Sequence, residues 1–194
     1  MNLAEIIAHH PEGATALVDG DERLTYGELR GSVQRGASAL AALGIHPGDR
    51  VGICGDNSIA VVIGLLAVVA TGAVAIPLNP HDPIAAIDHE LATVGASLLL
   101  LGPGASAPST VAVQDIDALV ALGTGTGADY VCQPRDASDL AVLLFTSGTA
   151  GAPRAAMLSH ATWSPISGRR SRAKIPRVPT MSCSASSRGF TSTV

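Results

Sequence analysis

The sequence predicts an α/β fold: a mostly parallel β-sheet with helices on both faces, followed by an irregular C-terminal tail. Three observations lead to this prediction. Strand and helix patterns alternate along residues 1–161. Several strand patterns are short, nearly uninterrupted apolar runs, which are typical of parallel strands buried on both faces. Residues 162–194 follow neither the period of 2 of a strand nor the period of 3.6 of a helix.

Composition narrows the class of protein. The 194 residues, 47% hydrophobic and 14% charged, suffice for one large domain or two small ones and exclude a mostly disordered chain. The net charge of −4 provides no basic footprint for nucleic acid. Cys54, Cys132 and Cys183 form no C-x-x-C motif, and residues 1–10 lack the basic start of a secretory signal, so we expect a cytoplasmic protein.

The first expected elements are a hairpin and a helix. Residues 14–18 and 23–25 have the pattern of two strands around a turn that Gly20 permits. Thr25 then begins a helix, because Glu28 three residues later completes a capping box. Gly44 ends this helix, whose apolar face consists of Leu29, Val33, Ala37 and Leu40.

A strand, an apolar helix and a second strand are expected next. The strand covers residues 50–54, and Ser58 caps the helix, which runs to about Thr71. The second strand covers residues 74–76. Because residues 59–76 contain no charged side chain, a membrane span is the alternative for this stretch. A break at Thr71 and flanks without Lys or Arg favour the buried helix and strand.

The following segments continue the alternation. Asp82 is expected to cap a helix that has Pro83 as its first residue and ends at Gly95. After it we expect a strand over 97–101, a loop over 102–109, a weaker strand and helix over 111–122, and a Gly/Thr loop over 123–127.

The sharpest motif follows an apolar strand over residues 141–145. Residues 146–154 read TSGTAGAPR, and such a loop suits phosphate at the end of a strand. Its glycines let backbone N–H groups turn toward an anion, its hydroxyls add donors, and its arginine adds a planar cation. The expected phosphate-binding residues are Thr146, Ser147, Gly148, Thr149, Gly151 and Arg154. The pattern G-x-x-x-x-G-K-[ST] is absent, and composition alone leaves an ordinary Ser/Thr/Gly loop equally open.

The fuller pattern resembles the adenylate-forming superfamily of AMP-dependent synthetases and ligases, and most of all its fatty acyl-CoA synthetases. That family's phosphate loop reads T-S-G-T-T-G-x-P-K-G-V, followed by a hydroxyl residue and His, and residues 146–160 read TSGTAGAPRAAMLSH. The resemblance extends to residues 24–29, 44–51 and 75–80. It implies that residues 1–161 are the start of an AMP-binding N-terminal domain, incomplete relative to the family's fold.

Three positions depart from the family's loop. Ala150 stands where Thr is usual, Arg154 where Lys is usual, and Ala155 where Gly is usual. The first change removes a hydroxyl donor, and the second replaces a compact ammonium with a bulkier fork. We therefore expect weaker phosphate binding that is not abolished.

The resemblance implies a two-step ligase reaction. A carboxylic acid, expected to be a fatty acid, attacks Mg²⁺-ATP to give acyl-adenylate and pyrophosphate, and coenzyme A then displaces AMP. The loop would hold the leaving pyrophosphate. The family's later motifs do not follow His160, and Lys174 lacks the context of the family's catalytic Lys. We therefore assign no catalytic residue and expect this chain alone to be inactive, with a vestigial or nucleotide-binding fragment as the alternative.

Charge marks a boundary near residue 161. Residues 1–161 hold all sixteen acids and six bases, whereas residues 162–194 hold six bases, no acid, eight Ser, four Thr and three Pro. Pro165 and Gly168 would break a helix here. Because GC-rich codons read out of frame give such a composition, we interpret residues 162–194 as out-of-frame or disordered, with a basic tail for acidic partners as the alternative. Translating all three frames of the gene beyond codon 155 tests this.

The remaining signals predict structural roles. The six histidines show no helical metal-ligand spacing and no H-E-x-x-H motif, so no metal site is expected. His160 is expected to cap or pack at the start of a helix, with a catalytic base as the less favoured alternative. Asp115 and Asp117 lie at a helix start, where carboxylates favour the helix dipole.

Overall fold

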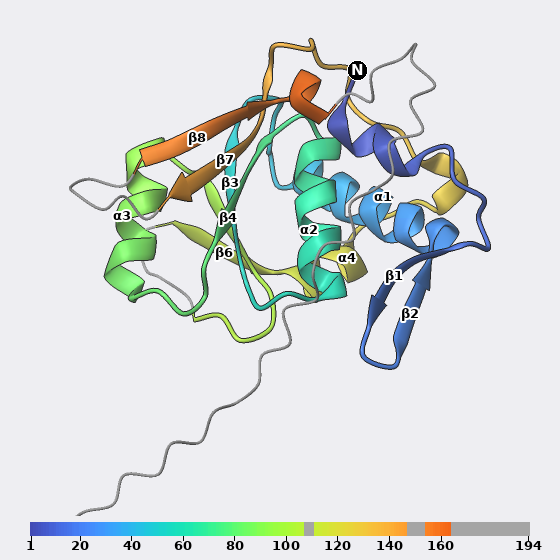
Figure 1. The fold of residues 1–194 in the computed structure, drawn as a ribbon, viewed down its shortest axis with the longest axis horizontal. Coiled ribbons are helices and arrows are strands. Elements are labelled where there is room, and N and C mark those ends of the chain that lie inside the picture. The colour runs from blue at the N-terminus through green and yellow to red at the C-terminus, as the bar shows by residue number, and fades with distance from the viewer. Residues whose placement is uncertain (107–110, 147–153, 164–194) are drawn as a thin grey trace, which may run out of the picture.

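A computed structural model describes residues 1–106, 111–146 and 154–163 (Figure 1). Its main sheet has the strand order β6-β5-β3-β4-β7-β8. The neighbours from β6 to β7 pair in parallel, and among the described strands of this sheet only β8 is antiparallel to its neighbour. The mostly parallel sheet is therefore confirmed. Its strands are β3 (Arg50–Cys54), β4 (Val74–Leu78), β5 (Leu98–Leu101), β6 (Ala112–Asp115), β7 (Leu140–Thr146) and β8 (Arg154–Ser159).

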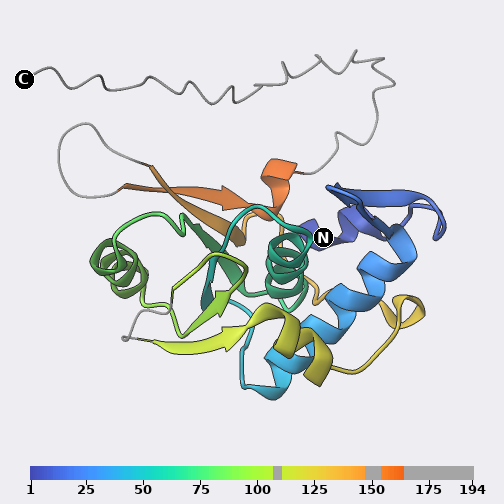
Figure 2. The same ribbon diagram turned by 90° about the horizontal axis from the view of Figure 1, so that it is seen from below.

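Helices cover both faces of this sheet, as predicted (Figure 2). The larger core cluster lies between one face and the helices α1 (Tyr26–Ala42), α2 (Ile59–Ala70) and α4 (Ile116–Leu122). The smaller cluster lies under α3 (Ile84–Val94) on the other face. A separate hairpin consists of β1 (Thr15–Asp19) and β2 (Glu22–Thr25), and the described 3₁₀ helices are η1 (Leu3–Ile7), η2 (Gly127–Asp129) and η3 (His160–Trp163).

The central strands are apolar throughout because both of their faces are buried. In β5, Leu98 and Leu100 belong to the core cluster under α2, whereas Leu99 belongs to the cluster under α3. In β3, a Cβ on Gly52 would lie 2.6 Å from Leu91 Cδ2 and 2.9 Å from Leu99 Cδ1. The missing side chain of Gly52 therefore lets α3 pack close to the sheet.

Most predicted helix ends are confirmed. The capping box of α1 is complete, since Thr25 Oγ1 accepts from the Glu28 N–H and Glu28 Oε2 accepts from the Thr25 N–H at 2.8 Å. Ser58 Oγ accepts from the Val61 N–H and caps α2. Gly95 ends α3 with a φ of 62°, in the left-handed region that favours glycine.

Helix α3 begins differently from the prediction. Pro83, expected to be the first helical residue, is instead the N-cap, and its carbonyl accepts from the Ala86 N–H. The Asp82 carboxylate, expected to cap the helix, accepts from Asn79 Nδ2 at 2.9 Å. The Asn79–Asp82 turn therefore uses the side chain that a helix cap would need.

Two strands also differ from the prediction. β4 continues through Pro77 to Leu78, whereas the predicted strand ended at residue 76. Proline has no N–H to donate, and the register between β4 and β7 is limited to Ala75 opposite Val142. β8 was not predicted as a strand. The buried helix and strand preferred for residues 59–76 are confirmed as α2 and β4, and no helix in the described part of the chain is long and apolar enough to cross a membrane.

An N-terminal strap, residues 2–7, joins distant parts of the fold. Asn2 is fully buried; its Nδ2 donates to Val69 O at 2.8 Å and to Gln133 O at 3.0 Å, and its Oδ1 accepts from the Ala4 N–H. The Tyr130 hydroxyl donates to Ala4 O. The strap thus bridges the end of α2 and the chain that precedes β7.

Candidate functional site

The predicted phosphate loop connects the two strands of the β7–β8 hairpin. β7 ends at Thr146 and β8 begins at Arg154, and these two residues face each other in the antiparallel ladder. The backbone thus brings Thr146 and Arg154 together. The other predicted binding residues, Ser147, Gly148, Thr149 and Gly151, lie outside the described residues.

The end of β7, where the predicted loop begins, lies at the edge where the parallel strands end. Because β7 runs parallel to β4, its carboxyl end shares an edge with those of β3 and β5. Open α/β sheets bind ligands at this edge. The place is therefore the one expected for a ligand loop.

Polar residues follow β3 and β4 at this edge. His81 Nε2 lies 3.1 Å from Asp56 Oδ1, and the His81 N–H donates to Asn79 Oδ1 at 3.1 Å. Asp56 and Asp82 bring negative charge, whereas Arg154 is the one Lys or Arg between residues 136 and 168 of the sequence. Arg154 is therefore the one residue of the hairpin sequence with a cationic side chain, the type of group that pairs with phosphate.

Cys54, at the end of β3, is fully buried beside this edge. Burial first, and then the charges of Asp82 and Asp56, raise the pKa of its thiol. A raised pKa keeps the sulfur protonated at neutral pH and makes it a poor nucleophile. Cys54 therefore has a packing role.

His160 lies at the opposite end of the hairpin from the phosphate loop. Leu140 pairs with Ser159 at one end of the ladder, and Thr146 pairs with Arg154 at the other. Six residue steps along a strand correspond to ~20 Å. His160 is therefore too far away to act as a base at the loop, and the catalytic alternative for this residue is not supported.

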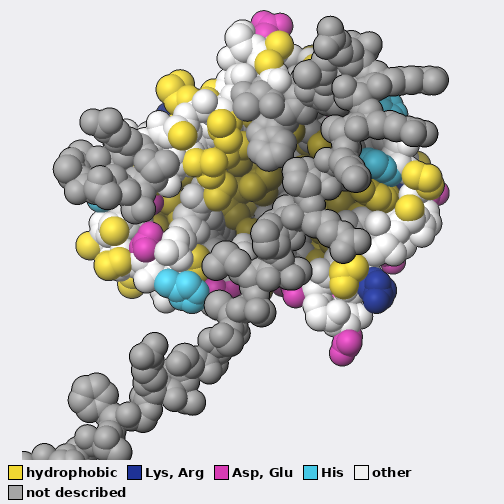
Figure 3. Space-filling model, in the orientation of Figure 1, with side chains coloured by type: hydrophobic (Ala, Val, Ile, Leu, Met, Phe, Trp, Pro, Cys, Tyr) yellow, Lys and Arg dark blue, Asp and Glu magenta, His cyan; other side chains and the backbone are white. Residues whose placement is uncertain are grey.

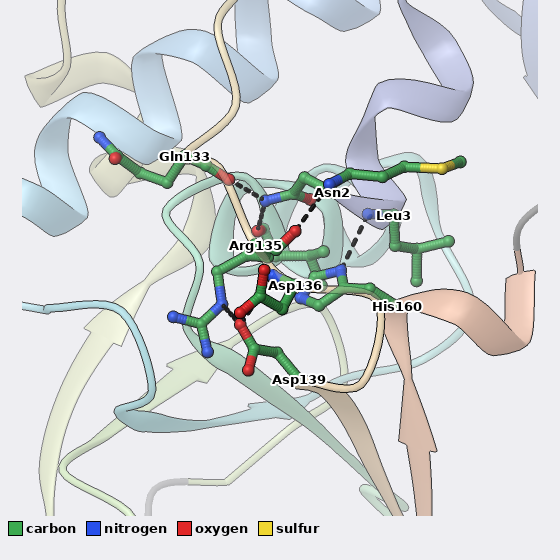
Figure 4. Close-up of polar contacts among 9 residues, drawn as sticks. Asn2, Leu3, Gln133, Arg135, Asp136, Asp139 and His160 are labelled. Atoms are coloured by element: carbon green, nitrogen blue, oxygen red, sulfur yellow. Dashed lines mark hydrogen bonds and ion pairs between the residues drawn. The ribbon is translucent and has the colours of Figure 1, made fainter.

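His160 instead packs at the start of η3, as expected (Figure 4). It is 1% exposed, and its Nδ1 accepts from the Leu3 N–H at 2.9 Å. Burial, followed by the positive charge of Arg135, lowers the pKa of the imidazole. The ring is therefore neutral at pH 7 and connects η3 to the strap.

The described residues contain no metal centre. Among residues 1–106, 111–146 and 154–163, no group of three or more His, Cys, Asp or Glu side chains is arranged to hold a metal ion. Backbone N–H groups, hydroxyls and a guanidinium are donors that suit phosphate oxygens.

The sheet covered by helices on both faces defines an α/β protein, and its strand β7 ends at the edge where such sheets bind ligands. The chain belongs to the AMP-binding enzyme family, whose sequence pattern matches residues 3–173. The resemblance of the sequence to adenylate-forming enzymes is thereby confirmed.

Relatives within this family differ in the acids that their names specify. The chain is 38% identical over 156 residues to a feruloyl-CoA synthase from Amycolatopsis, covering 77% of this chain and 31% of the relative. It is 32% identical over 157 residues to the medium/long-chain-fatty-acid–CoA ligase FadD6 of Mycobacterium tuberculosis, covering 74% and 26%. The chain thus spans about a third or less of the length of these relatives.

Solved structures of similar fold include the N-terminal subdomain of NpsA from Klebsiella oxytoca. It superposes with a TM-score of 0.70 and 28% identity, covering 81% of this chain and 41% of that one. ATP-bound MatB from Rhodopseudomonas palustris superposes with a TM-score of 0.71 and 27% identity, covering 82% and 35%. The predicted domain type, the N-terminal part of an adenylate-forming fold, is confirmed.

Proposed function

We propose that this chain provides the ATP-phosphate-binding part of an AMP-forming acid–CoA ligase. The loop over residues 146–154 binds the β- and γ-phosphates, and a carboxylic acid reacts at the α-phosphate. The loop's N–H groups, hydroxyls and Arg154 neutralise charge on the pyrophosphate as it leaves. Coenzyme A then accepts the acyl group.

The observation that carries this proposal is the position of the motif. A sequence rich in Ser, Thr and Gly joins the carboxyl end of β7 to β8, at the edge where parallel strands end. Membership of the AMP-binding enzyme family supports the nucleotide. Mg²⁺ would enter the reaction bound to the phosphates of ATP.

For the acid we propose a fatty acid. The similarity to the fatty-acid–CoA ligase of M. tuberculosis supports this choice, and the similarity to feruloyl-CoA synthase makes an aryl acid the second candidate.

The free thiols of Cys54 and Cys132 support a reducing cytoplasm as the compartment.

Arg154→Ala is expected to weaken pyrophosphate binding about tenfold or more. A charge-assisted hydrogen bond contributes about 1.5–3 kcal/mol, and 1.4 kcal/mol corresponds to tenfold in affinity. Titration calorimetry with Mg²⁺-pyrophosphate measures the effect. Arg154→Lys should bind at least as tightly as the original chain, because it keeps the charge and restores the residue that is usual in the family.

Arg23→Ala is the matched control, since Arg23 is an exposed arginine in β2, outside the main sheet. It should leave the affinity unchanged. If the Arg154→Ala and Arg23→Ala proteins bound pyrophosphate with equal affinity, the assignment of phosphate binding to the loop would be contradicted.

Exchange of labelled pyrophosphate into ATP separates a ligase from a nucleotide-binding fragment. We expect this chain alone to bind pyrophosphate but to give no exchange with fatty, aryl or amino acids. We expect this because the chain covers about a third or less of the length of its relatives. Exchange that depends on a fatty acid would show that the chain alone is an active enzyme, and exchange with ferulate instead would reassign the acid.

A further inference from the structure

The contact between His160 and the strap has a built-in dependence on protonation. Nδ1 of the buried ring accepts from the Leu3 N–H at 2.9 Å, so the neutral ring carries its proton on Nε2 (Figure 4). A second proton would have to enter at Nδ1. The ring would then present a donor to the Leu3 N–H, and the hydrogen bond would be lost.

The charged groups around the ring oppose this second proton on balance. On the side of the chain that precedes β7, the positive charge of Arg135 opposes protonation and the negative charge of Asp139 favours it; these two residues form an ion pair, with Asp139 Oδ2 3.0 Å from Arg135 Nε. On the strap side, the Met1 α-amino group opposes protonation and Glu5 favours it. A cavity of about 290 Å³ is lined by His160 and residues of the strap, and His9 and His10 also line it. Burial and Arg135 outweigh the carboxylates and lower the pKa of His160.

We propose that His160 is a pH-sensitive clasp: its neutral ring fastens the N-terminal strap to the end of β8, and its protonation loosens the strap. The two segments are 157 residues apart in sequence, and this bond joins them directly. The strap and β8 thus become less strongly coupled in acid. This inference does not depend on nucleotide binding, because His160 lies at the far end of the hairpin from the loop.

Hydrogen exchange of the strap amides tests the clasp in the full chain. The lowered pKa gives the sign: the closed strap is favoured above about pH 6.5, the ordinary value for histidine, and it opens as the pH falls toward the lower pKa of the folded state. Between pH 6.5 and the lower pKa of the folded state, the equilibrium constant for opening of the strap should rise by up to about tenfold per pH unit. This is the slope for uptake of one proton. The rates are measured by mass spectrometry and corrected for intrinsic exchange.

Two variants separate the clasp from general acid sensitivity. His160→Asn offers an amide oxygen in place of Nδ1 and does not titrate, so the strap should stay protected in acid. His46→Asn is the matched control, because His46 has a 79% exposed side chain in the turn before β3, and it should open in acid like the original chain. Acid-independent protection of the original chain, or acid opening in His160→Asn equal to that of the control, would overturn the proposal.

Nitrogen-detected NMR of the imidazoles covers the case in which His160→Asn does not fold. We expect His160 in the Nε2–H form at neutral pH, with a pKa below the ordinary value for histidine. Loss of Leu3 protection should follow the same titration curve. A His160 that carries its proton on Nδ1 at neutral pH, or that titrates while Leu3 stays protected, would contradict the clasp.

Discussion

Replacing Asn2 with alanine is expected to lower the free energy of unfolding by about 3 kcal/mol or more. The side chain is fully buried and serves three backbone groups: the carbonyls of Val69 and Gln133 and the N–H of Ala4. Each buried group left without a partner costs about 1–3 kcal/mol. Urea unfolding followed by circular dichroism measures the loss.

Asn2→Asp and Asn57→Ala separate this effect from a general loss of an asparagine. Asn2→Asp keeps an acceptor for Ala4 but directs a buried anionic oxygen at two carbonyls, so at neutral pH it should be at least as unstable as Asn2→Ala. Asn57 is exposed, and Asn57→Ala should change the stability by less than about 0.5 kcal/mol. A small effect of both Asn2 variants would mean that water replaces the amide.

We expect the chain to self-associate through the outer edge of β8, and replacing Met157 with lysine should make it a monomer. β8 is the last strand in the sheet order, and Ala155, Ala156 and Met157 are exposed along it. Met157 pairs with Leu143 across the ladder, yet Met157 is 72% exposed and Leu143 is 7% exposed. The packing that buries this face of the sheet therefore ends between β7 and β8. Figure 3 shows hydrophobic side chains gathered over these strands. A lysine on an edge strand blocks pairing with a second edge.

Sedimentation velocity at micromolar concentration measures this change. Val18→Lys is the matched control, because Val18 is also apolar, 55% exposed and in a strand, but it belongs to the separate β1–β2 hairpin. It should leave the association unchanged. A monomeric original chain would show that the outer edge of β8 does not drive association.

Much of the fold was predictable because local chemistry and tertiary packing agree. The strand over Arg50–Cys54 matches its predicted bounds, and Thr25 with Glu28 forms the expected capping box. The four residues of the predicted apolar face of α1 are all buried. β8 was missed because Ala-Ala-Met-Leu carries neither strict alternation nor β-branched residues, and its pairing with β7 decides its conformation.

The candidate site was less predictable than the fold. Alternation placed the loop after a strand, and the structure puts Thr146 and Arg154 side by side at its ends. The buried polar residues gave no such signal. Arg30 is 6% exposed and donates to the carbonyls of Ile7 and His10, and Asn2 serves groups as far away as residue 133. Such partners depend on long-range packing, which no local period encodes.

The long reach of the strap also bears on how the chain is made. Leu3 leaves the ribosome early, yet its partner His160 is 157 residues later in the sequence. At 5–20 residues per second, synthesis separates the two by about 8–30 s. Helix α2, with Val69, emerges well before that, so Asn2 meets one of its carbonyl partners first and Gln133 later. The strap is therefore synthesised before the residues that it contacts and is among the last segments to reach its final contacts.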